Sequence, residues 1–137
     1  METIYHLLDV PAEKAGFLRN AISTAAGFSG WWTSKTEQPE PGILRFNFPG
    51  NYHKDFKVLK KEANEFEYEC VDATPEWKGT RFSFKLMEDN GKIIIHFRHS
   101  GWKDQTPMFG ICNFHWALYM KSLKDLVETG TGNPTKV

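Results

Sequence analysis

Apolar and polar residues alternate with a period of two through the middle of the chain, from Ile43 to His99. In the clearest segment, Glu65 to Cys70, three glutamates alternate with three apolar residues. A strand with this pattern has one face in water and one face buried. Asn90-Gly91, between two such segments, is a strong hairpin signal. The predicted strands of this region are 43–48, 56–58, 66–70, 79–88 and 92–99.

The pattern before Ile43 is different. Glu2 to Leu8 predicts a short strand, and Pro11 stands where a helix can begin, since the first N–H groups of a helix have no partner there. Apolar residues at helical spacing then predict one or two short helices that end near Ala26. The stretch from Thr33 to Gly42 is polar and holds two prolines, so we expect a surface loop.

After Trp102 the period of the apolar residues changes to 3.6, which predicts one long helix. Gly130 follows the last apolar residue and can adopt the left-handed conformation that ends many helices, and Pro134 cannot continue a helix. The apolar stripe of this helix consists of Phe109, Cys112, Trp116, Tyr119, Met120, Leu123, Leu126 and Val127.

The predicted order is a strand, short helices, about five antiparallel strands and a long helix. One face of the twisted sheet must be covered, and the long helix is the only large apolar element left to cover it. We therefore predict an α+β helix-grip fold, with a curved antiparallel sheet of about six strands around the C-terminal helix and two short N-terminal helices. A length of 137 residues fits one domain, covering 1–137.

Composition narrows the function classes. Lys and Arg number 17, as do Asp and Glu, so the chain lacks the basic surplus typical of a protein that binds nucleic acid. The two cysteines, Cys70 and Cys112, lie among apolar residues and are interpreted as buried thiols rather than a disulfide framework. No charged segment precedes an apolar run, and no apolar stretch reaches about 18 residues. We expect no membrane span and a cytoplasmic location.

Five groups of residues, in order from about Pro11 to Pro134, carry a family resemblance. They are Gly30-Trp31-Trp32-Thr33; Glu76-Trp77 with Gly79-Thr80 and Phe82-Ser83-Phe84; His99 with Gly101-Trp102; Cys112 with Trp116; and Ser122-Leu123-Lys124 with Glu128, Gly130, Gly132 and Pro134. Together they resemble the START-like superfamily of polyketide cyclases and lipid-transport proteins. Within it the chain is most similar to the family of homologues of the activator of heat-shock-protein-90 ATPase. The resemblance implies the helix-grip fold and an internal cavity.

Aromatic residues face one another from the predicted sheet and the predicted helix. Most of them are explained as plain core, since apolar stripes at regular spacing usually are. They also suit an apolar pocket left between sheet and helix, and tryptophans at strand ends can plug such a pocket or line its entrance. The candidate ligand-binding residues are Trp32, Phe46, Phe48, Tyr68, Trp77, Phe82, Phe84, His99, Trp102, Phe109, Cys112 and Trp116.

The leading hypothesis is a non-catalytic protein that binds a small hydrophobic molecule, such as a lipid, a polyketide or a flavonoid-like compound, between sheet and helix. Cys112 is a small residue between Phe109 and Trp116, so a gap is expected beside it, towards Tyr68, Phe84 and His99. We expect no cofactor for this function. The lysine and glutamate faces of the strands are interpreted as solvated surface.

Two alternatives remain open. His99 falls on the inward face and is interpreted as a hydrogen-bonded core residue, but it could act as a general acid or base of a cyclase or hydrolase if Glu76 or Asp104 lay beside it. A metal site of Cys112, His115 and His99 lacks the tight local ligand pairs of structural zinc sites, so we expect no metal.

The second alternative is a module that contacts a chaperone and activates its ATPase, which predicts an exposed apolar patch outside the pocket.

Overall fold

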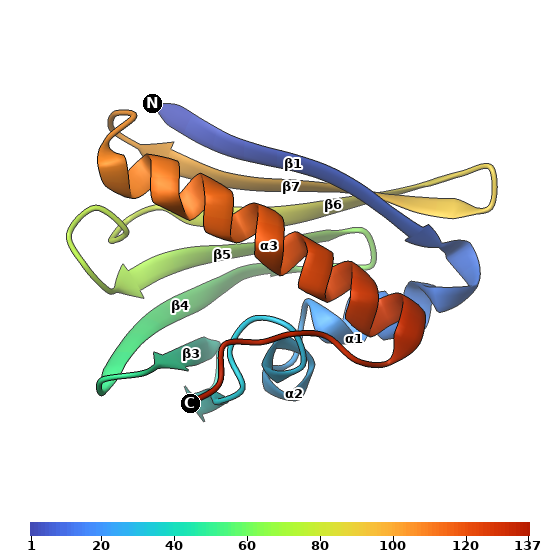
Figure 1. Ribbon diagram of the computed structural model, residues 1–137, viewed down its shortest axis with the longest axis horizontal. Helices are drawn as coiled ribbons and strands as arrows, with labels where there is room; N and C mark the ends of the chain where they lie inside the picture. Colours follow the sequence, from blue (N-terminus) through green and yellow to red (C-terminus); the bar gives the residue numbers. More distant parts are fainter.

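The computed structural model describes all residues from Met1 to Val137. One seven-stranded sheet is covered by one long helix, with two short helices at one edge (Figure 1). The elements are β1 (Glu2–Pro11), η1 (Ala12–Lys14), α1 (Ala15–Ala21), α2 (Ala25–Ser29), β2 (Thr36–Glu40), β3 (Ile43–Phe48), β4 (Tyr52–Lys61), β5 (Glu65–Asp72), β6 (Arg81–Asp89), β7 (Lys92–Trp102) and α3 (Pro107–Thr129).

Every pair of neighbouring strands in the sheet is antiparallel. The strand order is β1-β7-β6-β5-β4-β3-β2, so strands 2 to 7 form a meander and β1 joins beside the last of them. Asn90 and Gly91 both have positive φ, of 50° and 76°, as the tight turn between β6 and β7 requires. Alternate residues of β5 to β7 are buried, as the sequence predicts.

Helix α3 crosses the concave face of the sheet diagonally, with β1 along one side and α2 beyond its other side (Figure 1). Its start is fixed by Thr106, whose side chain accepts a hydrogen bond from the backbone N–H of Phe109. Its end is fixed by Gly130, which has the predicted left-handed conformation at φ 87°. No helix of the chain is long and apolar enough to cross a membrane.

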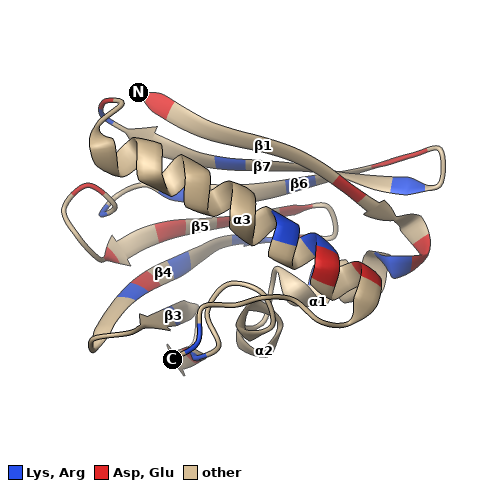
Figure 2. Ribbon diagram, viewed as in Figure 1, with Lys and Arg blue, Asp and Glu red and all other residues tan.

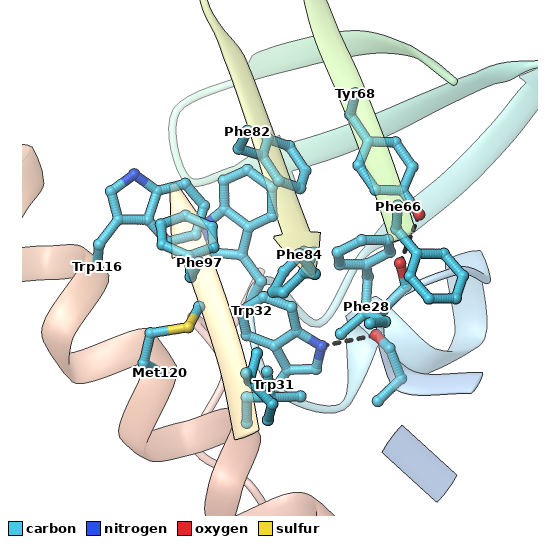
Figure 3. Packing of buried hydrophobic residues seen from close by; sticks show 14 of the residues in the cluster. Phe28, Trp31, Trp32, Phe66, Tyr68, Phe82, Phe84, Phe97, Trp116 and Met120 are labelled. Carbon is cyan, nitrogen blue, oxygen red and sulfur yellow. Dashed lines mark hydrogen bonds between the residues drawn. The ribbon is translucent and has the colours of Figure 1, made fainter. Parts of the chain in front are cut away.

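The core between α3 and the sheet is filled by large aromatic side chains (Figure 3). Trp31 and Trp32, which follow α2, reach its centre, and the indole N–H of Trp31 donates to the carbonyl of Ala21 at 2.8 Å. The hydroxyl of Tyr68 donates to the carbonyl of Ile22. The short N-terminal helices are thereby bound to the same core that joins α3 to the sheet.

Two predictions about the N-terminal third are wrong in detail. The predicted loop 33–42 contains β2, which pairs with β3 at the sheet edge, so the sheet has seven strands rather than about six. Four of the five residues of β2 are exposed, and Thr36 is half-buried. The strand includes Pro39, which an edge strand tolerates because its outer backbone groups have no partner. Strand β1 also extends to Pro11, three residues beyond Leu8.

Candidate functional site

A cavity of about 220 Å³ lies between α3 and the β3–β4 side of the sheet. Six of its nine lining residues are hydrophobic, and most of these are aromatic. An apolar, aromatic-walled hollow with a few polar groups has the usual character of a small-molecule site. The lining residues are Trp32, Phe48, Lys54, Trp77, Cys112, His115, Trp116, Tyr119 and Thr135.

Five candidates from the sequence lie together in this wall. Trp32 follows α2, Phe48 ends β3, Trp77 lies in the β5–β6 connection, and Cys112 and Trp116 are one turn apart on α3. They converge because the apolar stripe of α3 faces the inward residues of the sheet. Trp32 and Trp77, which lie in connections, fill the space at the edge of the sheet. Trp32 and Trp116 are in contact, with ring centroids 4.9 Å apart.

The other seven candidates lie outside the cavity wall. Five of them are fully buried inward-facing sheet residues and pack into the core: Phe46, Tyr68, Phe82, Phe84 and His99. Trp102 and Phe109 pack against each other near the start of α3, with ring centroids 5.5 Å apart. The expected gap does lie beside Cys112, but it opens towards Phe48 and Lys54; the direction predicted from the sequence, towards Tyr68, Phe84 and His99, is wrong.

Lys54 on β4 is a member of the wall that the sequence interpretation missed. It precedes the predicted strand 56–58 and is not among the candidate residues, yet it alternates with the inward-facing Phe56 and Val58, and that period is the signal that indicates it. Its ammonium lies 3.8 Å from the ring centroid of Trp77 and 4.6 Å from that of Phe48. Burial lowers the pKa of Lys54 to about 8.

The mouth of the cavity lies between α3 and the C-terminal tail. His115, Tyr119 and Thr135 line both the cavity and an adjoining hollow of about 310 Å³. The tail is held there by the hydroxyls of Tyr119 and Thr135, 2.6 Å apart, and by the backbone N–H of Thr135, which donates to the carbonyl of Trp32. The entrance is therefore bounded by a segment that hydrogen bonds hold in place.

His99 is fully buried and its ring nitrogens are both in hydrogen bonds. Nδ1 accepts from the indole N–H of Trp116 at 2.9 Å, so Nε2 carries the proton and donates to the hydroxyl of Thr80 at 2.8 Å. That hydroxyl donates in turn to the carbonyl of Trp77. Burial, with a smaller contribution from Lys54, lowers the pKa of His99 to about 3. The partners of His99 are a hydroxyl and an indole rather than Glu76 or Asp104, and His99 is not among the residues that line the cavity, so this geometry does not favour the acid–base alternative.

Metal ligation has little support at either candidate cluster. In the set suggested by the sequence, both nitrogens of His99 are already used within the core. A second cluster, on the outer face of the sheet, consists of His53, Asp55 and Asp72, whose ligand atoms lie within 4.8 Å of one another. The guanidinium of Arg45 binds both carboxylate oxygens of Asp55, at 2.9 and 3.0 Å, which neutralises the charge that would attract a cation.

A larger hollow, of about 610 Å³, lies on the outer face of the sheet. Its walls come from β5, β6 and β7 and from the ends of their connections. Only Leu86 and Met87 among its nine lining residues are hydrophobic. A shallow surface with charged walls does not suit an apolar molecule, so the smaller aromatic cavity is the better candidate.

No family model matches the chain, and no curated protein matches it in sequence. Among solved structures, the Aha1 dimer from Colwellia psychrerythraea is 30% identical, with a TM-score of 0.85 over 96% of this chain and 100% of that one. The chain belongs to the Aha1 family. This confirms the family resemblance found in the sequence.

More distant structures share the fold of this Aha1-family chain. Protein MLL2253 from Mesorhizobium loti is 19% identical, with a TM-score of 0.70 over 90% of this chain and 96% of that one. DynU16, from the dynemicin biosynthetic locus, is 15% identical, with a TM-score of 0.75 over 96% of this chain and 49% of that one. At these identities the likeness shows the helix-grip fold alone.

Proposed function

We propose that this protein binds a small apolar molecule in the cavity between α3 and the β3–β4 side of the sheet. The observation that carries the proposal is the aromatic wall of the hollow along residues 112–119 of α3. Three tryptophans line it, and the ring centroid of Trp116 lies 4.9 Å from that of Trp32 and 6.2 Å from that of Trp77. Burial of an apolar molecule there releases water from aromatic surface, which contributes about 25 cal/mol per Å².

The volume limits the size of the molecule. A cavity of about 150 Å³ is enough to hold benzene, and this one measures about 220 Å³. It therefore suits one aromatic ring with a short substituent, or two fused rings when the adjoining hollow near His115 contributes space. Among the hydrophobic ligands expected from the sequence, the smallest compounds fit best.

Tryptophan fluorescence offers a direct test, since three indoles line the cavity. Toluene, cyclohexanol and decalin, none of which emits when the indoles are excited at their long-wavelength edge, are titrated into the full chain and are expected to give saturable changes. Cys112→Leu fills the cavity and should abolish them, whereas Ala117→Leu, on the exposed side of the same helix, should leave them unchanged. Equal responses of the two variants, or no saturable change with any of the three compounds, would contradict the proposal.

A second candidate function is supported by the outer face of α3. Met108, Ile111, Phe114 and Leu118 are exposed along it, by 37 to 58%, and this half of the helix carries no charged residue (Figure 2). We infer that a second copy of this chain covers this face, because the similar Colwellia protein is a dimer. The chaperone contact that the family implies is a competing occupant of the same surface.

Sedimentation velocity over a wide concentration range tests the second candidate. The wild-type chain is expected to be a dimer, and the double variant Phe114→Ser with Leu118→Ser is expected to be a monomer. The matched control is Phe17→Ser, at a residue on α1 that is 66% exposed, and it should leave the dimer intact. A monomer at all concentrations would contradict self-association. If the double variant instead lost stimulation of a heat-shock-protein-90 ATPase, the face would be the chaperone contact.

A further inference from the structure

Lys54 carries a positive charge into a cavity whose other walls are mainly apolar. It extends from β4 on the concave side of the sheet, and its ammonium lies over three aromatic rings, with centroid distances of 3.8 Å to Trp77, 4.6 Å to Phe48 and 5.5 Å to Tyr52. Ring faces attract a cation, but they accept none of its three N–H groups as a carboxylate would.

The ammonium has no counter-charge in the protein. Lys54 forms neither a hydrogen bond nor an ion pair, whereas its neighbour on the outer face of the strand, Asp55, is bound by Arg45. A partly buried charge without a partner is unfavourable, and proteins usually pair such charges. The partner of Lys54 is therefore to be sought outside the chain.

The titratable groups that face Lys54 do not supply a negative charge at neutral pH. Burial raises the pKa of the Cys112 thiol on α3 and raises that of Cys70 on β5 to about 11. His99 on β7 is neutral, because burial lowers its pKa to about 3. His115, at the mouth, can only be neutral or positive. The cavity thus has an uncompensated positive charge.

We propose that the natural ligand is a small aromatic carboxylic acid, whose carboxylate pairs with Lys54 while its ring lies between Trp32, Trp77 and Trp116. This inference rests on the proposed function and specifies its ligand class. A single carboxylate matches the single ammonium in charge, and the aromatic walls match a ring in shape. The cavity volume of about 220 Å³ holds a one-ring acid entirely and a two-ring acid with its end near the mouth.

Isothermal titration calorimetry with matched pairs of compounds tests the charge requirement. The probes are trans-cinnamate and 2-naphthoate, each compared with its uncharged primary amide, on the full chain at about pH 7. Both acids are expected to bind about 10- to 100-fold more tightly than their amides, the usual effect of a hydrogen bond to a charged group. Equal affinity of acid and amide would overturn the carboxylate proposal but leave the proposed function standing.

Three variants assign the preference to the lysine. Lys54→Met should bind both amides normally and lose the preference for the acids. Lys54→Arg should retain it, and Lys57→Met, an exposed lysine on the outer face of the same strand, is the control that retains it as well. A preference that survived in Lys54→Met would overturn the proposal. If none of the four compounds bound to the wild-type chain, both the carboxylate proposal and the proposed function would be wrong.

The pH dependence separates a charge effect from a change of shape. Because burial lowers the pKa of Lys54 in the unliganded chain to about 8, the preference of the wild type should fall to a few-fold or less by about pH 9.5, while the carboxylates stay ionised. Lys54→Arg, which remains charged, should keep its preference at that pH. A preference that did not change with pH in the wild type would contradict the role of this ammonium. Capture of cinnamaldehyde on Lys54 by borohydride, without binding of the acids, would show a nucleophilic lysine and overturn the proposal.

Discussion

The indole N–H of Trp116 donates a hydrogen bond to Nδ1 of His99 over 2.9 Å, and this contact joins α3 to β7 in the middle of the core. It fixes the imidazole as the neutral tautomer with its proton on Nε2, which then donates to Thr80. A polar chain of this kind holds the helix in one position on the sheet, since any shift of α3 would leave buried groups unpaired. The cavity wall beside Trp116 is positioned by the same contact.

We expect acid to destabilise the protein through His99. Its pKa is about 3 in the folded chain and about 6.5 when unfolded. The unfolded state therefore binds a proton below about pH 6.5 that the folded state excludes, and the stability present above that pH is lost as the pH falls towards 3. The free energy of unfolding should drop by about 1.4 kcal/mol per pH unit between about pH 6 and 4.5.

Urea unfolding at a series of pH values measures this slope. His99→Gln, which cannot take up a proton in either state, should show a shallower dependence and lower stability at pH 7, because Trp116 and Thr80 lose optimal partners. Identical slopes for the variant and the wild type would show that other groups control acid stability. Staying above about pH 4.5 limits the contribution of the carboxylates.

The charge of Lys54 is expected to reduce the stability of the unliganded chain. The folded pKa of about 8 lies below the unfolded value of about 10.4, so protonation favours the unfolded state as the pH falls through this window. Lys54→Met should raise the free energy of unfolding at pH 7 by about 1–3 kcal/mol, which allows for the loss of the contacts with Trp77 and Phe48. The gain should vanish above about pH 10, where the wild-type amine is neutral in both states. A variant less stable than the wild type at pH 7 would indicate that the aromatic contacts outweigh the burial of the charge.

Much of the fold could be predicted because periodic burial is a property of sequence. The alternation in β5 and β7 and the stripe of α3 each follow from one face being wet and the other dry. Strand β2 could not be found, since four of its five residues are exposed and show no alternation. Besides the backbone ladder, the side-chain amide of Asn47 on β3 donates to the carboxylate of Glu37 on β2 at 2.7 Å, and neither contact leaves a periodic pattern in the side chains.

The location of the cavity could be predicted only in part. The small size of Cys112 correctly indicated where α3 leaves room, but the inward residues Tyr68 and Phe84 fill the space opposite it, and Trp31 adds to that filling. A void is the difference between large volumes, so the pattern of residue types does not fix its position. The sequence did not indicate Lys54 as a cavity residue for another reason. A lysine in a lysine-rich strand resembles solvated surface unless one follows which of the alternating positions face inward.

Close packing between the two short N-terminal helices should make Gly27 sensitive to substitution. A Cβ atom there would lie 2.1 Å from the carbonyl oxygen of Asn20 and 2.7 Å from the Cα of Ala21, both backbone atoms. Gly27→Ala is expected to lower the free energy of unfolding by about 1–3 kcal/mol or more. Gly16→Ala is the matched control, because a Cβ there has no atom within 4 Å, and it should stabilise α1 by about 0.5–1 kcal/mol. Thermal unfolding distinguishes them, and a neutral Gly27→Ala would mean that α1 and α2 separate easily.

The two thiols should differ in reactivity, although burial raises the pKa of both. Cys112 lines the cavity, whereas Cys70, on the inward face of β5, is almost fully buried and is not part of the cavity wall. Iodoacetamide at about pH 8 should therefore modify both slowly, with Cys112 first, because the thiolate is the reactive form and only Cys112 can be reached through the mouth. Mass spectrometry of the intact protein follows the reaction, and Cys112→Ser identifies the site. A ligand in the cavity should protect Cys112, while urea should make both thiols react at the rate of free cysteine. Modification of Cys70 first would show that the sheet opens more readily than the cavity admits a small molecule.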